Sequence, residues 1–325
     1  MAVTLKDVAQ LAGVSVATVS RVINDKGYLS AATRAKVAAA IEELGYQPNF
    51  MARSLQGKQT QLIGLVFPSI QNVFYAELIE ALEDKLYQQG YKSFLATCDY
   101  QSNKEKAYIE MLQANRVDGM IVGSHALKPA DYADVQAPVV SFDRYLGPSI
   151  PIVSSDNYRG GQLVGQHFQK KGLTNIAIVT GANEADSPTY DRYLGFKESL
   201  SDQENIALSH WQLLPDYSMV RRRLVLGDLL RTPGLEGIFC TDDLTALLVL
   251  DLLGHDQNKN SIQVVGYDGS QLINRYHSYL TTVQQPVADL ADLCVEMLMK
   301  RIAGQVFSDH THIKLPVYLR VGTSG

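Results

Sequence analysis

Residues 8–24 read VAQLAGVSVATVSRVIN, and this stretch decides how the first part of the chain folds. Ahead of it, Thr4 lies three residues before Asp7, a spacing that allows a hydroxyl and a carboxylate to cap a helix reciprocally. Apolar residues then recur with helical spacing until Gly13, which breaks the helix. Ser15 can cap a second helix directly after the break. The stretch therefore predicts two short helices joined by a tight turn.

A third helix is predicted between Ser30 and Gly45. Ser30 can cap its start, and Gly45 suits the left-handed conformation that ends many helices. The apolar side chains that recur one turn apart between them are Val37, Ile41 and Leu44. Residues 1–46 are therefore expected to form a helix-turn-helix DNA-binding domain, although the helical pattern alone also fits a three-helix bundle of another purpose.

The second predicted helix presents small side chains at its outward start. A helix-turn-helix places this part of its second helix in the major groove, where small apolar groups contact thymine methyls and Arg binds guanine. The predicted base-contacting residues are Val16, Ala17, Ser20 and Arg21. Polar side chains nearby are expected to contact phosphates, which orient the protein without reading sequence. These are Thr18, Ser30, Thr33 and Arg34.

The charge of the chain is unevenly distributed. The net charge is -5 over 325 residues, which by itself argues against nucleic-acid binding. Residues 1–60, however, contain seven basic and four acidic side chains, a balance of +3, so the remainder carries -8. A basic head on an acidic body indicates that only the head approaches phosphates, although such a balance is also common on ordinary surface helices.

Length and composition exclude several classes of protein. With 325 residues and 46% hydrophobic content, the chain has material for two or three domains. Its densest apolar run, residues 247–253, is too short to span a membrane and contains Asp251. No export signal is recognisable, so we expect a cytoplasmic protein without membrane contact. Three distant cysteines, and histidines without ligand spacing, predict no disulfide, no metal site and no cofactor.

The head resembles the DNA-binding domain of LacI/GalR-family transcriptional regulators. The resemblance rests on residues 8–24 and continues through GYQPN at residues 45–49 into ARSLQG at residues 52–57. It implies a hinge helix within residues 47–60 that folds on the operator and inserts Leu55 into a minor-groove step. A helix of about two turns is marginal in water without a partner, which agrees with this implication. The alternative is an ordinary interdomain linker. The predicted DNA-binding set also includes Thr4, Ser15, Asn24, Asn49 and Arg53.

From residue 62 onward, short apolar runs alternate with longer helical stretches. This alternation is typical of strand-helix-strand units that build parallel sheets. The predicted strands are residues 63–67, 93–96, 119–122, 139–142, 176–180, 237–239 and 264–267. The predicted fold class is therefore an α-helical head and hinge followed by an α/β body.

Polar and aromatic residues follow the predicted strands at their carboxyl ends, where open α/β sheets bind ligands. Carboxylates accept hydroxyl hydrogen bonds, Arg offers a planar set of donors, and aromatic faces cover the apolar side of a sugar ring. We therefore predict a site for a polyol. Its residues are Phe74, Tyr75, Ser124, Asp143, Arg192, Asp242 and Asp268. Each Asp taken singly also fits a loop or helix cap, and Asp243 in particular is predicted to cap the helix that follows it.

The body resembles the same family along nearly its whole length. The matching segments are SFDR at 141–144, SDN at 155–157, RYLGF at 192–196, TDD at 241–243 and GYDG at 266–269. The resemblance implies a two-lobed, periplasmic-binding-protein-like sensor over residues 61–325, with crossings near Asn157, Gln285 and Leu319. One lobe would comprise about residues 62–157 and 287–316, and the other about 158–285 with the C-terminal segment. The resemblance adds Gln285 to the ligand set, and the chain departs from the family's usual asparagine at Asp242.

These features predict a sequence-specific repressor whose operator affinity is controlled by a small sugar or sugar phosphate. Residues 138–145 and 152–157 look closest to sucrose-operon repressors, with ribose-operon repressors behind them. The last residues lack the leucine heptads that form tetramers, so a homodimer on a pseudo-palindromic operator is expected. Whether the effector induces or corepresses stays open.

Two other classes of protein fit parts of the sequence. Several carboxylates in a cleft could serve a glycoside hydrolase, but Arg192 beside them would keep them ionised for binding, whereas such an enzyme needs one carboxyl with a raised pKa. A sugar-binding protein of a transport system would have no use for a DNA-binding head. We therefore expect a regulator rather than an enzyme.

Overall fold

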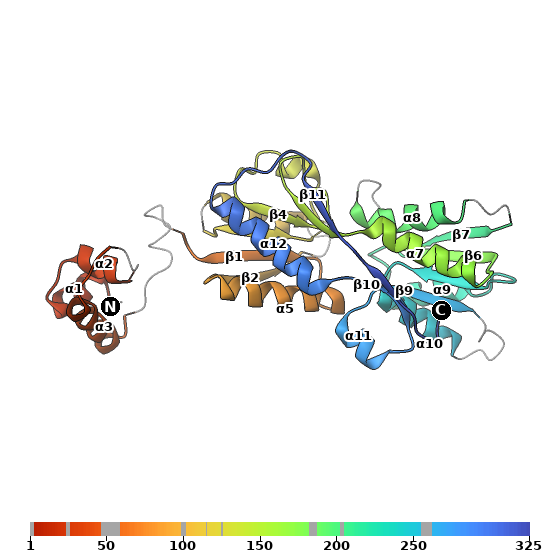
Figure 1. Cartoon of the computed structure of the whole chain (residues 1–325), viewed down its shortest axis with the longest axis horizontal. Coiled ribbons are helices and arrows are strands. Elements are labelled where there is room, and N and C mark those ends of the chain that lie inside the picture. The colour runs from red at the N-terminus through yellow and green to blue at the C-terminus, as the bar shows by residue number, and fades with distance from the viewer. Residues whose placement is uncertain are drawn as a thin grey trace. The chain divides into compact units, whose positions relative to one another are not determined.

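The structure of the chain is a computed structural model that describes residues 3–23, 27–46, 59–98, 102–114, 116–124, 126–181, 187–201, 205–254 and 262–325. It divides into two compact units, Met1–Thr60 and Gln61–Gly325. The first unit contains the helical head and the second contains two sheets with helices around them (Figure 1).

The head consists of three helices. They are α1 (Leu5–Ala12), α2 (Val16–Ile23) and α3 (Ala31–Leu44). Thr4, Ser15 and Ser30 precede them, and each interacts through its side chain with a residue three positions on. Gly13 and Gly45 follow α1 and α3 with φ of 65° and 58°, the left-handed conformation that glycine adopts without strain. Val8, Val19 and Val37 are fully buried between the helices. The predicted three-helix head is confirmed.

The first lobe of the body, the N-lobe, is built on six parallel strands in the order β11-β5-β4-β3-β1-β2. The strands are β1 (Leu62–Phe67), β2 (Lys92–Thr97), β3 (Gly119–Val122), β4 (Val139–Phe142), β5 (Ile152–Ser155) and β11 (His312–Leu315). The helices are α5 (Val73–Gln88), α6 (Ser102–Gln113), the 3-10 helix η1 (Pro129–Tyr132) and α12 (Val287–Ile302). Successive residues of β1 face opposite sides of the sheet, so Leu65 packs with α5 and α12, and Val66 with α6.

The second lobe, the C-lobe, repeats this architecture in the order β12-β10-β9-β8-β6-β7. The strands are β6 (Asn175–Thr180), β7 (Ala207–Gln212), β8 (Gly237–Cys240), β9 (Gln263–Asp268), β10 (Thr281–Gln284) and β12 (Tyr318–Arg320). The helices are α7 (Asn157–Lys170), the 3-10 helix η2 (Pro188–Tyr190), α8 (Asp191–Ser199), α9 (Met219–Leu229), α10 (Asp243–Leu253) and α11 (Gln271–Tyr276). β12 pairs antiparallel with β10, whereas the other described pairs are parallel.

The chain passes between the two lobes three times (Figure 1). It crosses between β5 and α7, between β10 and α12, and between β11 and β12. Since the carboxyl ends of parallel strands lie at one edge of a sheet, the residues after β4, β8 and β9 gather near these crossings. The polar residues that occupy the first two crossings are Ser155, Asn157 and Gln285.

All seven predicted strands are present, and the predicted fold class is confirmed. Five further strands were not predicted, namely β5, β7, β10, β11 and β12. The segment predicted to form a hinge helix, residues 47–60, lies almost wholly outside the described residues. Within the described ranges, no helix is long and apolar enough to cross a lipid bilayer.

Candidate functional site

The outward start of α2 is small and accessible. Val16 is 41% exposed, Ala17 and Arg21 are exposed, and Ser20 is half-buried. The intervening Val19 is fully buried in the head, which fixes the side of the helix that faces away from the core. The four residues predicted to contact bases therefore lie on the accessible side of α2, as direct contact with base edges requires.

The residues predicted to contact phosphates lie at helix starts, as do Thr4 and Ser15 of the wider DNA-binding set. The Ser15 and Ser30 hydroxyls accept hydrogen bonds from the backbone N–H groups of Thr18 and Thr33, at 3.1 and 3.2 Å. Thr4 donates its hydroxyl hydrogen to Asp7 at 2.7 Å. These contacts make Thr4, Ser15 and Ser30 helix caps in the structure. Arg34 lies half-buried in the first turn of α3. Four other predicted DNA contacts, Asn24, Asn49, Arg53 and Leu55, lie outside the described residues.

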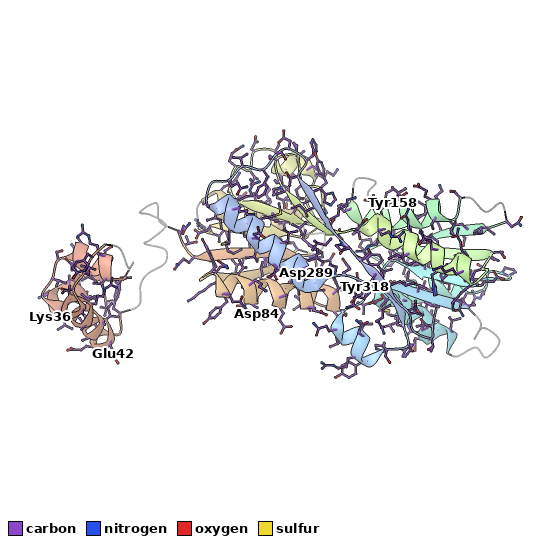
Figure 2. The ribbon with its side chains drawn as sticks, viewed as in Figure 1. Lys36, Glu42, Asp84, Tyr158, Asp289 and Tyr318 are labelled. Carbon is purple, nitrogen blue, oxygen red and sulfur yellow. The ribbon has the colours of Figure 1, made fainter. Side chains whose placement is uncertain are left out.

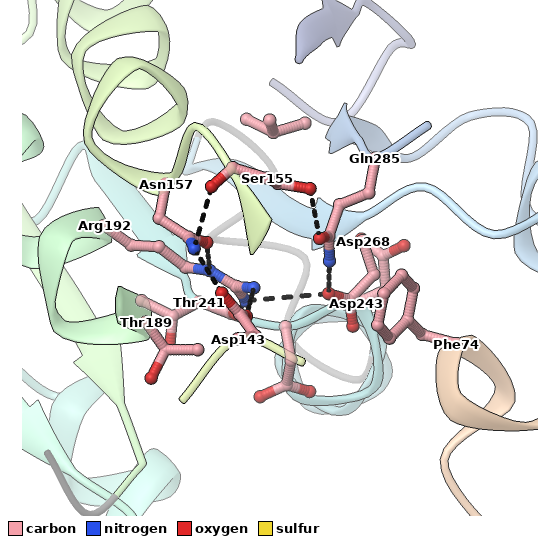
Figure 3. A network of polar contacts seen from close by, with 12 residues as sticks. Phe74, Asp143, Ser155, Asn157, Thr189, Arg192, Thr241, Asp243, Asp268 and Gln285 are labelled. Atoms are coloured by element: carbon pink, nitrogen blue, oxygen red, sulfur yellow. Dashed lines mark hydrogen bonds and ion pairs between the residues drawn. The ribbon is translucent and has the colours of Figure 1, made fainter. Parts of the chain in front are cut away.

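Arg192 lies at the centre of a polar network between the lobes (Figure 3). Its side chain extends from the first turn of α8, and the residue is only 6% exposed. Its Nε donates to Asn157 Oδ1 and its Nη1 to the carbonyl oxygen of Thr241, both at 2.7 Å. The guanidinium lies 3.7 Å from the centre of the Tyr267 ring. Arg192 is thus held by hydrogen bonds at its edge and by an aromatic ring against its face.

Two carboxylates from different sheets converge on this guanidinium. Asp143 follows β4 and brings Oδ2 to 3.5 Å from Nη2. Asp268 ends β9 and brings Oδ1 to 3.6 Å from Nη1. Both residues have positive φ, 53° and 115°, a region that side-chain-bearing residues seldom occupy. Such strain is typical of functional sites, where the surroundings hold a residue in place.

The residues of the lobe crossings link the two carboxylates to each other. Asn157 Nδ2 donates to Asp143 Oδ1 at 2.6 Å, and Gln285 Nε2 donates to Asp268 Oδ1 at 2.8 Å. Ser155 Oγ donates to Gln285 Oε1 at 2.7 Å (Figure 3). The network therefore spans both lobes and the segments that join them. Ser155, Asn157, Thr241 and Tyr267 were not predicted as site residues.

Burial and charge oppose each other in the network. Burial raises the pKa of Asp143, and Arg192 and Asn157 offset part of that rise. The pKa of Asp268 is raised well above its usual range, chiefly by burial. The expectation that Arg192 would prevent a raised carboxyl pKa at this site is therefore wrong, because burial outweighs the charge of the guanidinium. Burial lowers the pKa of Arg192, but the interactions of the guanidinium with Tyr267, Asp268 and Asp143 outweigh burial, and the net shift of the pKa is upward. Arg192 therefore stays charged, and a ligand that supplies hydroxyl donors would stabilise the ionised carboxylates.

The assignment of the helix cap to Asp243 was wrong. The cap of α10 is Asp242, whose two carboxylate oxygens accept from the backbone N–H and the hydroxyl of Thr245, each at 2.7 Å. Its φ and ψ of -151° and 155° are extended, so the helix begins only after it. Asp243 is buried and accepts hydrogen bonds from the Gly269 N–H at 2.8 Å and the Thr282 hydroxyl at 2.5 Å.

The remaining predicted ligand residues belong to the N-lobe. Phe74 is buried in its core, 6.0 Å from Phe142 between ring centres. Tyr75 is half-buried and is among the groups that raise the pKa of Arg192. Ser124 is buried, and its hydroxyl donates to the Cys98 carbonyl at 3.3 Å. The structure thus brings Asp143, Arg192, Asp268 and Gln285 into one network, with Tyr75 and Asp242 near enough to act on it electrostatically.

Known proteins resemble the chain over nearly its whole length. It is 47% identical to the sucrose operon repressor of Lactococcus lactis subsp. lactis, over 98% of this chain and 99% of that protein. It is 39% identical to the ribose operon repressor of Halalkalibacterium halodurans, over 99% of this chain and 97% of that protein. The crystal structure of the lac repressor dimer bound to operator and the anti-inducer ONPF matches with a TM-score of 0.85 and 27% identity, over 100% of this chain and 99% of that one.

Two protein-family models also match the sequence, one for each unit. Residues 4–49 match the bacterial regulatory proteins of the lacI family. Residues 60–318 match the periplasmic binding proteins and sugar binding domain of the LacI family. The two matches fall on the helical head and the two-lobed body, in the order in which the chain carries them. The chain therefore belongs to the LacI family of bacterial regulatory proteins.

Proposed function

We propose that the chain is the repressor of a sucrose operon. It binds a pseudo-palindromic operator as a homodimer through α2, and a sugar held between the lobes changes its affinity for that operator. One observation carries the proposal. The chain is similar throughout to sucrose operon repressors, and it has the Arg192 network at the edges of both sheets. The family consists of regulatory proteins, which agrees with the expectation that the chain is not a glycoside hydrolase.

The geometry of the head supports the DNA-binding part of the proposal. Val16 and Ala17 are small enough to allow close approach to base edges, and Arg21 supplies the donors that guanine accepts. In the proposal, residues 47–60 form the hinge helix and Leu55 enters the minor groove, where the unstacking cost is offset by additional contacts to bent DNA.

The geometry of the network supports the sugar-binding part. Asp143 and Asp268 extend from different lobes, and Arg192 lies between them. Neighbouring hydroxyl groups of a sugar could therefore donate to carboxylates of both lobes at once and accept from the guanidinium. A ligand that contacts both lobes stabilises one arrangement of them over others, which is the requirement for coupling to the operator.

The proposal is tested by fluorescence anisotropy with a labelled duplex from upstream of a sucrose gene, and with a scrambled duplex as control. The full chain should bind the first duplex more tightly than the second at 150 mM salt. Sucrose should change the affinity for the first duplex at least severalfold, and the direction of the change gives the sign of regulation. Equal affinity for the two duplexes would refute the DNA-binding part, and an unchanged affinity with sucrose would refute the choice of effector.

Two variants separate the two activities. Arg21→Ala should weaken specific operator binding by about 1–3 kcal/mol and leave the sugar affinity intact, since it removes one base contact. Asp268→Ala should abolish the response to sugar while the operator is still bound. If either variant lost both activities while remaining folded, the assignment of separate DNA and sugar sites would be wrong.

Ribose is the second candidate effector, because the chain is also similar throughout to a ribose operon repressor. The same anisotropy assay with ribose in place of sucrose decides between the two sugars.

A further inference from the structure

Carboxylates outnumber cations around Arg192. Asp143 and Asp268 approach its guanidinium to 3.5 and 3.6 Å. Asp242 and Asp243 lie at the start of α10, and the charges of both act on Asp268. Two carboxyl groups therefore lie beside the guanidinium, and two more act on one of them. If Asp243 and Asp268 share one proton, the four carboxyl groups keep three negative charges, against the two positive charges of Arg192 and Arg320, so the balance remains negative.

Three of the five N–H donors of Arg192 are already engaged. Its Nε is bonded to Asn157, its Nη1 to the Thr241 carbonyl and its Nη2 to Asp143. The two remaining N–H groups belong to Nη1 and Nη2, which lie 3.6 and 3.5 Å from the carboxylates of Asp268 and Asp143. A neutral hydroxyl can accept from them, whereas a phosphate bound there would lie against both carboxylates.

The other cations near the network are directed elsewhere. Lys314 forms an ion pair with Asp191 at 3.2 Å. Arg144 follows Asp143 in sequence but is only 4% exposed, and it donates inward to the Leu127 carbonyl. Arg320, whose charge acts on Asp243, donates to the carbonyl oxygens of Ser278 and Leu280. Lys314 is thus paired with a carboxylate, and the guanidinium groups of Arg144 and Arg320 donate to backbone carbonyl oxygens outside the Arg192 network.

The helix starts beside the network are occupied as well. A helix N-terminus commonly binds phosphate through its unpaired N–H groups. At α10, however, the side chain of Asp242 accepts the Thr245 N–H, and Asp243 adds a second carboxyl in the first turn. At α7, Asp156 accepts the Arg159 N–H at 3.0 Å. The positive ends of both helices are thus already matched by carboxylates of the chain.

We propose that this site selects an uncharged sugar and rejects the phosphorylated form of the same sugar. The inference rests on the proposed function, because it assumes that the Arg192 network holds the effector. A phosphate ester carries a charge of about -1.5 to -2 at neutral pH. Bringing that charge into a buried site with excess carboxylates is repulsive, whereas the hydroxyl groups of a neutral sugar donate to the same carboxylates favourably.

Isothermal titration of the full chain with matched pairs of ligands tests the inference. The probes are sucrose with sucrose 6-phosphate and ribose with ribose 5-phosphate, at pH 7.5 and 150 mM salt, with inorganic phosphate as an anion control. The phosphate ester should bind at least about tenfold more weakly than its parent sugar, because the ester adds charge repulsion from the carboxylates that the neutral sugar does not meet. An ester that binds as tightly as its parent, or measurable binding of inorganic phosphate in the cleft, would overturn the inference. If no member of either pair bound, the proposed function itself would fail.

A conservative substitution shows whether the carboxylates cause the discrimination. Asn caps helices as well as Asp does, so Asp242→Asn removes one charge while the start of α10 keeps its cap. The ratio of sugar affinity to ester affinity should fall severalfold in this variant. Asp84→Asn is the matched control, because Asp84 is exposed on α5 and its side chain points away from the body (Figure 2). An unchanged ratio in Asp242→Asn, or an equal fall in Asp84→Asn, would contradict the proposed cause.

Discussion

Asp268 holds a backbone conformation that non-glycine residues rarely adopt, with φ of 115°. Such a conformation costs on the order of 1–3 kcal/mol and persists only where neighbouring contacts impose it. Asp243 supplies one of these contacts, since its carboxylate accepts the N–H of Gly269, the next residue, at 2.8 Å. Gln285 supplies another by donating to the Asp268 carboxylate. Asp243 is therefore a positioning residue for Asp268.

The buried carboxyl of Asp243 makes stability depend on pH. Burial raises the pKa of Asp243 to about 7. In the unfolded chain an Asp titrates near 4, so the folded state binds the proton more tightly, and the free energy of unfolding should fall as pH rises from about 4 to about 7. In Asp243→Asn this fall should be smaller than in the natural chain. Urea unfolding at several pH values measures the free energy of unfolding of both proteins. If this free energy changed equally with pH in the two proteins, the raised pKa of Asp243 would be contradicted.

The part of the network that sequence reasoning found consists of side chains whose chemistry is visible in the sequence. Asp143, Arg192 and Asp268 follow apolar runs and carry charge, so their type and place both indicated a site. Thr241 could not be found in this way because its backbone carbonyl makes the contact. Tyr267 was assigned to a core strand, since nothing in its sequence shows that its ring lies against a guanidinium. The helix cap was assigned to Asp243 instead of Asp242 because the two residues are consecutive aspartates, and the sequence alone does not show which of them precedes the helix.

At the scale of elements, glycines allow α7 and α8 to pack closely enough to place Arg192. A Cβ on Gly161 would lie 2.1 Å from the Arg192 carbonyl oxygen and 2.7 Å from the Phe196 nitrogen. A Cβ on Gly195 would lie 2.0 Å from the Tyr158 carbonyl oxygen. These are backbone atoms, so any side chain at either position would force the helices apart. The position of Arg192 beside Asn157, the first residue of α7, depends on this close approach.

Gly161→Ala should therefore destabilise the body by about 1–3 kcal/mol, the usual range for overpacking, and should weaken sucrose binding more than tenfold by displacing Arg192. Gly227→Ala is the matched control, because a Cβ there meets no atom within 4 Å and the position is helical. Alanine at that position should preserve or slightly raise stability. Thermal unfolding and titration with sucrose measure both effects. If Gly161→Ala bound sucrose normally, the close packing would not be what positions Arg192.

The strands that were missed show where periodicity loses its predictive value. β10 is almost completely buried, yet it begins with Thr281 and Thr282, whose hydroxyls are polar but satisfied inside the fold. β11 and β12 have four and three residues, too few to display an alternating pattern. β7 is an edge strand and mostly accessible, so it lacks a continuous apolar run. Most of the predicted strands are buried on both faces and therefore consist of apolar residues, as in β1, β3 and β4. Burial alone does not decide the matter, because β2 is a largely accessible edge strand that was predicted and β5 is a fully buried strand that was missed.

At the scale of the whole body, contacts remote from the sugar network also join the lobes. Glu77 of α5 accepts the backbone N–H of Gln271 at the start of α11, at 2.7 Å. Val73, at the start of the same helix, packs against the core of the C-lobe. Lys314 of β11 pairs with Asp191 of α8. These contacts stabilise the arrangement in which Asp143 and Asp268 converge on Arg192. In the proposed function, we therefore expect them to contribute to sugar affinity without touching the sugar.

Glu77→Gln should accordingly weaken sucrose binding about threefold to tenfold, because the neutral amide oxygen accepts the Gln271 N–H by roughly 1 kcal/mol less than the carboxylate does, which favours separated lobes. Glu83→Gln is the matched control, since Glu83 is exposed on the same helix, and this variant should leave the affinity unchanged. Titration with sucrose measures the first effect, and operator titration with and without sucrose measures the coupling. Since coupling between two ligands is reciprocal, a variant that shifts the lobes must also shift operator affinity in the absence of sugar. If Glu77→Gln changed neither affinity, the contact between α5 and α11 would have no part in regulation.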